Sequence, residues 1–167
     1  NTYAKEFVPF VAAADSNNGR INNDLNSNAR DPALKIFNGD LFVAWSEFYG
    51  AGFKIFVKKF DGSSAWIAYP SGDLNTNPGE DAKQPKLESW NGNLYLLWIE
   101  NDSPGYDRVH AKRLDDSNPA SPTWTSVDGG SPSLSEDANA HATSLSTATT
   151  ADGFFAGWIQ NNTIYVK

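Results

Sequence analysis

One pattern occurs three times in this chain of 167 residues, and it restricts the possible fold more than any other feature. In each copy a short apolar run ends in a tryptophan, and an alanine stands sixteen positions before that tryptophan. The tryptophans are Trp45, Trp98 and Trp158, and the alanines are Ala29, Ala82 and Ala142. The repeated spacing indicates a unit of about 50 to 60 residues, which is within the range of propeller blades.

The repeating unit has the features of four short antiparallel strands, and the third copy, residues 134–167, is expected to lack the fourth, outer strand. Asn38-Gly39 and Asn91-Gly92 stand between apolar runs, which is a strong signal for a hairpin turn. The runs that end in tryptophan are apolar at consecutive positions, as in strands that are covered on both faces. β-branched and aromatic residues dominate the strand segments and disfavour a helix. We therefore predict an all-β protein, a β-propeller built of four-stranded antiparallel blades.

The repeat divides the chain into about three blades. We predict one propeller segment over residues 1–167, with blades at residues 21–73, 74–133 and 134–167. Residues 1–20 are expected to hold an outer strand, near Phe10 to Ala14, that completes the third blade of another copy. A ring typically needs ~4–8 blades, so three are too few to close one. We expect oligomerisation to complete the ring, preferably a homodimer with about six blades and otherwise a trimer with about nine; the alternative is a piece of a longer propeller.

Charge and composition exclude several partners and sites. The chain has 13 Lys and Arg against 20 Asp and Glu, a net charge of −7, which argues against nucleic-acid binding. No run approaches the ~20 apolar residues that a membrane helix needs, so no membrane insertion is expected. The absence of cysteine excludes disulfides and thiolate metal sites. Acidic pairs such as Glu80-Asp81 could offer oxygens to calcium, but no spaced ligand motif supports this, and we predict no metal and no cofactor.

The motifs of the repeat resemble a known group of proteins. The combination of Pro-x-Leu, Asn-Gly, Leu-Tyr-x-x-Trp-x-Glu, and then x-Val-x-Lys-x-x-Asp-Gly before a tryptophan is similar to tandem β-propeller repeats of bacterial secreted and surface proteins. It is more distantly similar to lectin-like and sialidase-like propellers. The resemblance covers nearly the whole chain and implies an extracellular or cell-surface, carbohydrate-related setting. It carries no catalytic residue across, because propellers host binding, scaffolding and catalysis alike.

One end of the blades combines polar and aromatic residues in the expected loops. In an up-and-down blade, the loop before the first strand and the loop between the second and third strands lie on the same side. Sugars are bound by a flat aromatic face together with a few fixed polar groups. The predicted ligand-binding residues on this side are Tyr49, Tyr106, Glu47, Glu100, Asn101 and Asp107. The alternative interpretation is that these polar residues form turns and that the tyrosines cover loop ends.

The sequence lacks the motifs that would identify a hydrolase of the sialidase type. Such an enzyme needs an arginine cluster, an acid and a nucleophile, and the arginines here do not recur at one position of the repeat. The pattern Ser-x-Asp-x-Gly-x-Thr-Trp is also missing. We therefore predict that the chain is not an enzyme but a non-catalytic binding or scaffold module, with carbohydrate as the expected ligand. The alternatives are a structural or protein-interaction propeller without a small ligand, and a fragment of a sialidase-like glycoside hydrolase.

Overall fold

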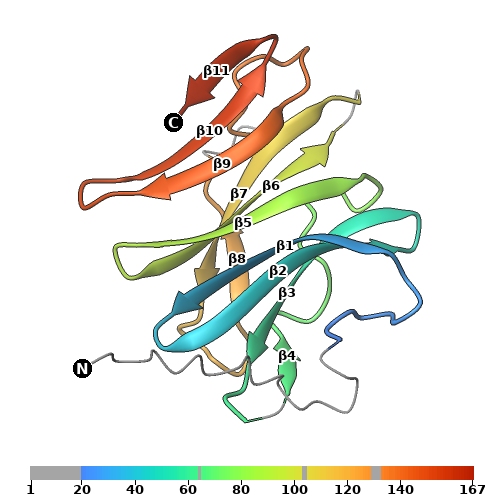
Figure 1. The fold of residues 1–167 in the computed structure, drawn as a ribbon, viewed down its shortest axis with the longest axis vertical. Coiled ribbons are helices and arrows are strands. Elements are labelled where there is room, and N and C mark those ends of the chain that lie inside the picture. The colour runs from blue at the N-terminus through green and yellow to red at the C-terminus, as the bar shows by residue number, and fades with distance from the viewer. Residues whose placement is uncertain (1–19, 64, 103–104, 129–132) are drawn as a thin grey trace, which may run out of the picture.

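The computed structural model describes residues 20–167 except 64, 103–104 and 129–132, and the described part contains strands and no helix. The strands form three separate antiparallel sheets, in the orders β1-β2-β3-β4, β5-β6-β7-β8 and β9-β10-β11 (Figure 1). The bounds are β1 (Ala29–Phe37), β2 (Asp40–Tyr49), β3 (Gly52–Phe60), β4 (Trp66–Ala68), β5 (Ala82–Trp90), β6 (Asn93–Asn101), β7 (Asp107–Asp115), β8 (Thr123–Ser126), β9 (Thr143–Thr149), β10 (Phe154–Gln160) and β11 (Thr163–Val166). The predicted all-β fold with propeller blades is confirmed.

The three sheets are successive blades, which we call blade 1 (β1–β4), blade 2 (β5–β8) and blade 3 (β9–β11). They lie side by side in chain order in Figure 1, and the first strand of each blade makes the contact with the blade before it. Thus β5 lies against β1, β2 and β3, and β9 lies against β5 and β6. The closing strand expected near Phe10 to Ala14 lies outside the described residues.

Short turns connect the strands as the sequence predicts. Asn38 and Gly39 have φ of 50° and 86°, and Asn91 and Gly92 have φ of 47° and 71°. Positive φ at both central residues is the type I′ geometry, whose twist matches that of the paired strands. The Asn-Gly dipeptides therefore set the register between the first two strands of blades 1 and 2.

Two of the three buried hydrophobic clusters lie between blades, and the third, around Trp45, lies on blade 1. Trp98 belongs to a buried cluster that joins blade 2 to Ile55 and Val57 of blade 1. Trp158 belongs to a second cluster that joins blade 3 to Val109 and Ala111 of blade 2. This arrangement explains why the strands are apolar at consecutive positions, since a blade with a neighbour on each side buries both of its faces.

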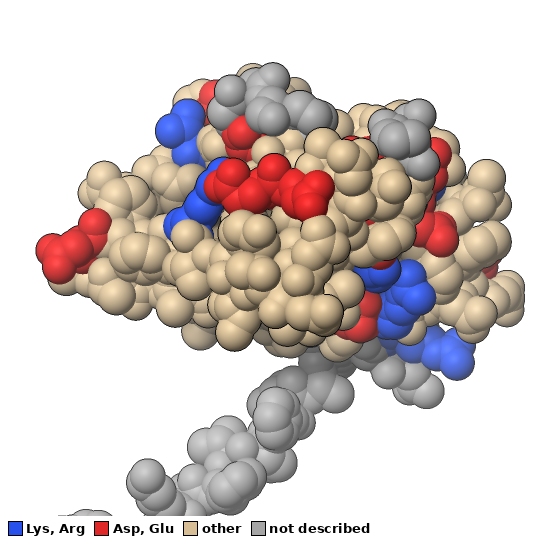
Figure 2. All heavy atoms as spheres, turned by 90° about the horizontal axis from the view of Figure 1, so that it is seen from above, with Lys and Arg blue, Asp and Glu red and all other residues tan. Residues whose placement is uncertain are grey.

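The end of the molecule that blade 3 forms has few charged side chains over much of its area. Figure 2 looks down on the end that blade 3 forms: most of the side chains in this view are uncharged, and a group of acidic side chains near the middle adjoins basic ones. No helix in the described part of the chain is long and apolar enough to cross a membrane.

Candidate functional site

The Trp-x-Glu pattern forms a hydrogen-bonded pair inside each blade. Residues two apart on a strand point to the same face, so the tryptophan and the acidic residue are neighbours. Trp45 Nε1 donates to Glu47 Oε2 at 2.7 Å, and Trp98 Nε1 donates to Glu100 Oε2 at 2.6 Å. In blade 3 the acceptor is Gln160, whose Oε1 lies 3.3 Å from the Nε1 of the last repeated tryptophan.

The same acceptors hold the loop that enters each blade. Glu47 accepts the backbone N–H groups of Asn23 and Asp24 at 3.0 and 2.7 Å. Glu100 accepts those of Thr76 and Asn77, at 3.0 and 2.5 Å. A carboxylate that accepts several N–H bonds is well stabilised even when it is buried. We call this arrangement the loop clamp.

The clamp explains where two of the predicted ligand-binding residues lie. Glu47 and Glu100 are completely buried, and their oxygens face the tryptophan and the loop backbone. They therefore lie beneath the loops rather than on the outer surface. Their assignment as ligand-binding residues stays a prediction, and the site described below does not depend on it.

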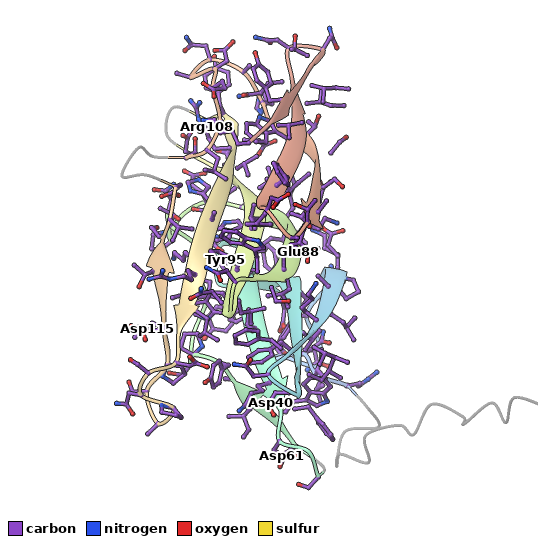
Figure 3. The ribbon with its side chains drawn as sticks, turned by 90° about the vertical axis from the view of Figure 1, so that its left-hand side faces the viewer. Asp40, Asp61, Glu88, Tyr95, Arg108 and Asp115 are labelled. Carbon is purple, nitrogen blue, oxygen red and sulfur yellow. The ribbon has the colours of Figure 1, made fainter. Side chains whose placement is uncertain are left out.

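A polar hollow of about 470 Å³ lies on the loop side, where blades 1 and 2 meet. We call this side, formed by the loops that enter each blade and those between its second and third strands, the loop face. The hollow is lined by Arg30, Ala51, Gly79, Glu80, Asp81, Lys83, Asn101 and Asp107. Acidic, basic and amide side chains thus converge on one space. In Figure 3, Arg108 and Asp115 mark the two ends of β7, and Arg108 is at the loop-face end.

The three carboxylates around the hollow have different surroundings. Asp107 Oδ2 is 2.8 Å from Lys83 Nζ and 3.4 Å from His141 Nδ1. Asp81 Oδ1 accepts the backbone N–H of Phe53 at 2.7 Å, across the boundary between blades. Within the described part of the chain, the Glu80 carboxylate takes part in no hydrogen bond or ion pair, so its oxygens are available to a ligand.

Arg30 stands at the edge of the hollow in a well-defined position. Its Cζ atom lies 3.6 Å from the centre of the Phe53 ring, and its Nε lies 3.9 Å from Asp31 Oδ2. Stacking on an aromatic ring orients the guanidinium plane while its N–H groups stay accessible. The side chain is therefore suited to donating hydrogen bonds to a polar ligand.

A backbone irregularity recurs at the start of each first strand, and in blades 1 and 2 it adjoins Arg30 and Lys83, which line the hollow. Asp31, Gln84 and Ser144 have φ of 56°, 53° and 58°, and the register between the first and second strands shifts at this point in every blade. A β-bulge with a residue in the left-handed region redirects the chain and often occurs next to functional sites. The side chain of Asp31 accepts the backbone N–H of Gln84 at 3.1 Å, so the bulges of blades 1 and 2 are linked.

The structure brings some of the predicted ligand-binding residues together and separates another. Asn101 and Asp107 are partners in the β6–β7 ladder, and both line the hollow. Tyr106 precedes Asp107, and its ring centre is 5.3 Å from that of His141. Tyr49 lies in blade 1, 54% exposed, and borders a different hollow of about 180 Å³.

Sequence reasoning did not select Arg30, Lys83 or Asp31. A signal was present for Asp31, because the proline after it removes a ladder donor and favours an irregular strand start. For Arg30 and Lys83 no local signal exists, since their role depends on how two blades pack. Among the described residues, no group of three or more histidine and acidic side chains is placed to hold a metal ion.

Comparison with known proteins gives matches only at the level of three-dimensional structure. No family model matches the sequence, and no curated protein matches it. The structures that match include an α-L-arabinofuranosidase from Lactobacillus brevis, with 15% identity and a TM-score of 0.54 over 86% of this chain and 50% of that one. A second, described as a glycoside hydrolase, has 12% identity and a TM-score of 0.51 over 81% of this chain and 49% of that one.

A third match is Zg3597, a family 117 glycoside hydrolase from the marine bacterium Zobellia galactanivorans, with 12% identity and a TM-score of 0.46 over 82% of this chain and 53% of that one. This chain thus spans about half the length of the structures that it matches. The similarity to the two structures with TM-scores of 0.54 and 0.51 agrees with the propeller-like fold, whereas the specific tandem-repeat family inferred from the motifs stays a prediction.

These matches correct the prediction that the chain is not an enzyme. That prediction depended on one missing motif and on arginines that do not recur. The matched proteins are glycoside hydrolases, so a similar fold carries catalysis in proteins that share little sequence with this one. The absence of these features was the wrong criterion, because different sets of residues on one fold can perform related chemistry.

Proposed function

We propose that this chain is part of a carbohydrate-active β-propeller of the glycoside hydrolase type, and that the polar hollow between blades 1 and 2 binds the sugar. The observation that carries the proposal is the set of acidic, basic and amide side chains that line one hollow of about 470 Å³ on the loop face. Sugar hydroxyls are both donors and acceptors, so they need both kinds of partner in a fixed arrangement. The likeness to two glycoside hydrolase structures supports the choice of ligand class.

The surroundings of the carboxylates suit different roles. Hydrolysis of a glycosidic bond generally uses two carboxyl groups, one that transfers a proton and one that acts as base or nucleophile. The carboxylate of Glu80 takes part in no hydrogen bond or ion pair within the described part of the chain, which suits a group that must exchange a proton with a substrate. Asp107 is held by Lys83, which suits a fixed, ionised carboxylate that accepts hydrogen bonds from hydroxyl groups or stabilises positive charge.

The remaining lining groups would position the substrate. Arg30 and Lys83 donate to ring and hydroxyl oxygens, and Asn101 offers both an acceptor and donors. Tyr106, whose ring lies tilted against that of His141, provides an aromatic surface next to Asp107. We place the substrate outside the cell or at its surface, in line with the resemblance to secreted and surface propellers.

The test uses the 167-residue chain with 4-nitrophenyl α-L-arabinofuranoside, chosen because one matched structure is an α-L-arabinofuranosidase. Release of nitrophenol is expected, and Glu80→Gln is expected to lower kcat by about 10²- to 10⁴-fold, the usual contribution of general acid–base catalysis. Glu136→Gln is the matched control, since Glu136 is an acidic loop residue of blade 3 that pairs with Lys167 and lies outside the hollow.

Calorimetric titration with arabino-oligosaccharides separates binding from hydrolysis. Asp107→Asn is expected to weaken binding at least about tenfold, because it removes a charged acceptor and releases Lys83. Binding without any hydrolysis would contradict the catalytic part of the proposal. If the chain neither binds nor hydrolyses these sugars, the assignment of the hollow is wrong.

A further inference from the structure

The outer face of blade 3 exposes residues whose equivalents are buried in the other blades. Ile164 is 75% exposed, whereas Val109, at the same position of blade 2, is 0% exposed. Val166 and Ile159 are likewise exposed, whereas their equivalents in blade 2, Ala111 and Ile99, are buried. In blade 2 these positions are covered by blade 3, so blade 3 presents the kind of surface on which a further blade packs. We call this surface the outer face of blade 3.

The first strand of blade 1 shows the complementary exposure. Leu34 is 61% exposed, whereas its equivalent Leu87 in β5 is 4% exposed and lies in the cluster shared with blade 1. Ala29 is likewise exposed, and its equivalent Ala82 is completely buried. Since β5 is the strand of blade 2 that lies against blade 1, β1 is the strand with which blade 1 would contact a preceding blade.

A polar contact between blades recurs, and the equivalent groups at the outer face of blade 3 and at β1 make no such contact within the described part of the chain. The residue just before the repeated alanine accepts a backbone N–H from the preceding blade. Asp81 Oδ1 accepts that of Phe53 at 2.7 Å, and His141 Nδ1 accepts that of Asp107 at 3.1 Å. The equivalent acceptor of blade 1 is Asn28, which is exposed. The equivalent donor of blade 3 is the backbone N–H of Asn162, beside the outer face.

We infer that the outer face of blade 3 binds β1 of a second copy of this chain, head to tail, and that the second copy returns the same contact. The argument is continuity with the two interfaces inside the chain, because the open faces are repeat equivalents of surfaces that already pack together. Figure 2 shows that most side chains at the end that blade 3 forms are uncharged, apart from a group of acidic and basic side chains near the middle, and uncharged surface of this kind favours such packing. A contact of this kind that closes gives a ring of two chains. The inference is independent of the proposed sugar site.

The contact between copies is weaker than those inside the chain, for an identifiable reason. Blades 1 and 2 carry Lys54 and Arg108 at the start of their third strands, and both donate to backbone carbonyls of the loop that enters the next blade. Blade 3 has Thr163 at this position, which is too short to make the same contact. The dimer is therefore expected to dissociate on dilution.

Light scattering of the 167-residue chain over a dilution series tests the inference. The expected mass is near twice the 18.2 kDa of one chain at high concentration, and it falls toward one chain on dilution. Ile164→Arg and Leu34→Arg are each expected to give a monomer, because each places a charge in both contacts of the ring. Both side chains are largely exposed, so neither substitution should prevent folding.

Mixing the two variants identifies the arrangement. Ile164→Arg retains a normal β1, and Leu34→Arg retains a normal outer face of blade 3, so one intact contact forms and the mixture regains a dimer. Ile67→Arg is the control, since Ile67 is exposed and its equivalent Thr125 stays exposed in blade 2, which has neighbours on both sides. A monomer at every concentration overturns the inference. So does a Leu34→Arg variant that dimerises alone, because the contact would then join two identical faces.

Discussion

Blade 2 and blade 3 are built from the same repeat but differ in what surrounds them and in one residue of the loop clamp. Blade 2 lies between two blades, and the side chains on both faces of β6 are buried, including Leu96, Leu97 and Ile99. In the described structure blade 3 has a neighbour on one face only, and its clamp uses Gln160 where blade 2 uses Glu100. The comparison teaches that the repeat specifies a blade with two apolar faces, whether or not a neighbouring blade covers each of them.

The largest expected loss of stability comes from replacing the repeated tryptophan, which is Trp98 in blade 2 and Trp158 in blade 3. Trp98→Ala is expected to lower the free energy of unfolding by about 3–5 kcal/mol, because it leaves a cavity between blades 1 and 2 and removes a donor to Glu100. Trp158→Ala should cost less, since the acceptor that it leaves behind is an uncharged amide. Urea denaturation of the two variants measures the difference. Equal losses would mean that the charge of the clamp does not matter.

Exchanging the clamp residues sharpens the comparison. Gln160 Nε2 donates to the carbonyls of Asp137 and Ala140, at 2.9 and 2.8 Å, which a carboxylate cannot do. Gln160→Glu should therefore cost about 1–3 kcal/mol in the free energy of unfolding, because the buried carbonyl of Ala140 and the partly buried one of Asp137 would face a negative charge. Denaturation at neutral pH measures this loss, and an unchanged midpoint would contradict it.

The reverse exchange is expected to cost a similar amount for a different reason. Glu100 accepts two loop N–H groups and one indole N–H, so the NH₂ group of Glu100→Gln would face donors. A loss of about 1–2 kcal/mol is expected. The same denaturation experiment applies, with Glu136→Gln as an exposed control. A stabilised Glu100→Gln would show that the buried charge costs more than its hydrogen bonds contribute.

The smallest expected effect is a pH-dependent loss of stability at a residue type found only in blade 2, a histidine at a position where both neighbouring blades have another aromatic residue. His110 stacks on Trp98 with ring centres 5.6 Å apart, at the position that Phe56 and Tyr165 occupy in the other blades. Burial lowers the pKa of His110 below its ordinary value, and the charges of Glu100 and Asp128 oppose this only in part. Protonation therefore occurs more readily in the unfolded chain than in the folded one.

The consequence is a loss of stability in mild acid. Below pH 6.5 His110 is protonated in the unfolded chain, whereas in the folded chain it stays neutral until the pH reaches its lowered pKa. Over that window the contribution of this group lowers the free energy of unfolding by at most about 1.4 kcal/mol per pH unit. His110→Phe should remove this dependence while keeping the stacking. Thermal unfolding at several pH values measures it, and an identical pH profile for the variant would refute the assignment to His110.

Much of the architecture followed from the order of residues alone. The spacing of Ala82 and Trp98 in their repeat, and the Asn-Gly dipeptides, predict strands and turns because they act through local backbone geometry and through burial of alternate or consecutive side chains. The same pattern placed Glu100 at the end of a strand. It did not reveal that the carboxylate turns inward to hold a loop, since that depends on the donors nearby.

The sequence by itself determined the repeat, the strands and the two-sided character of each blade, because these depend on residues close together in the chain. Only the tertiary structure decided which polar groups share a space. Arg30 and Asp107 line one hollow although they are far apart in the sequence and belong to different blades. Their meeting depends on how the faces of two blades pack, and the periodicity of a single strand contains no information about its neighbour's position.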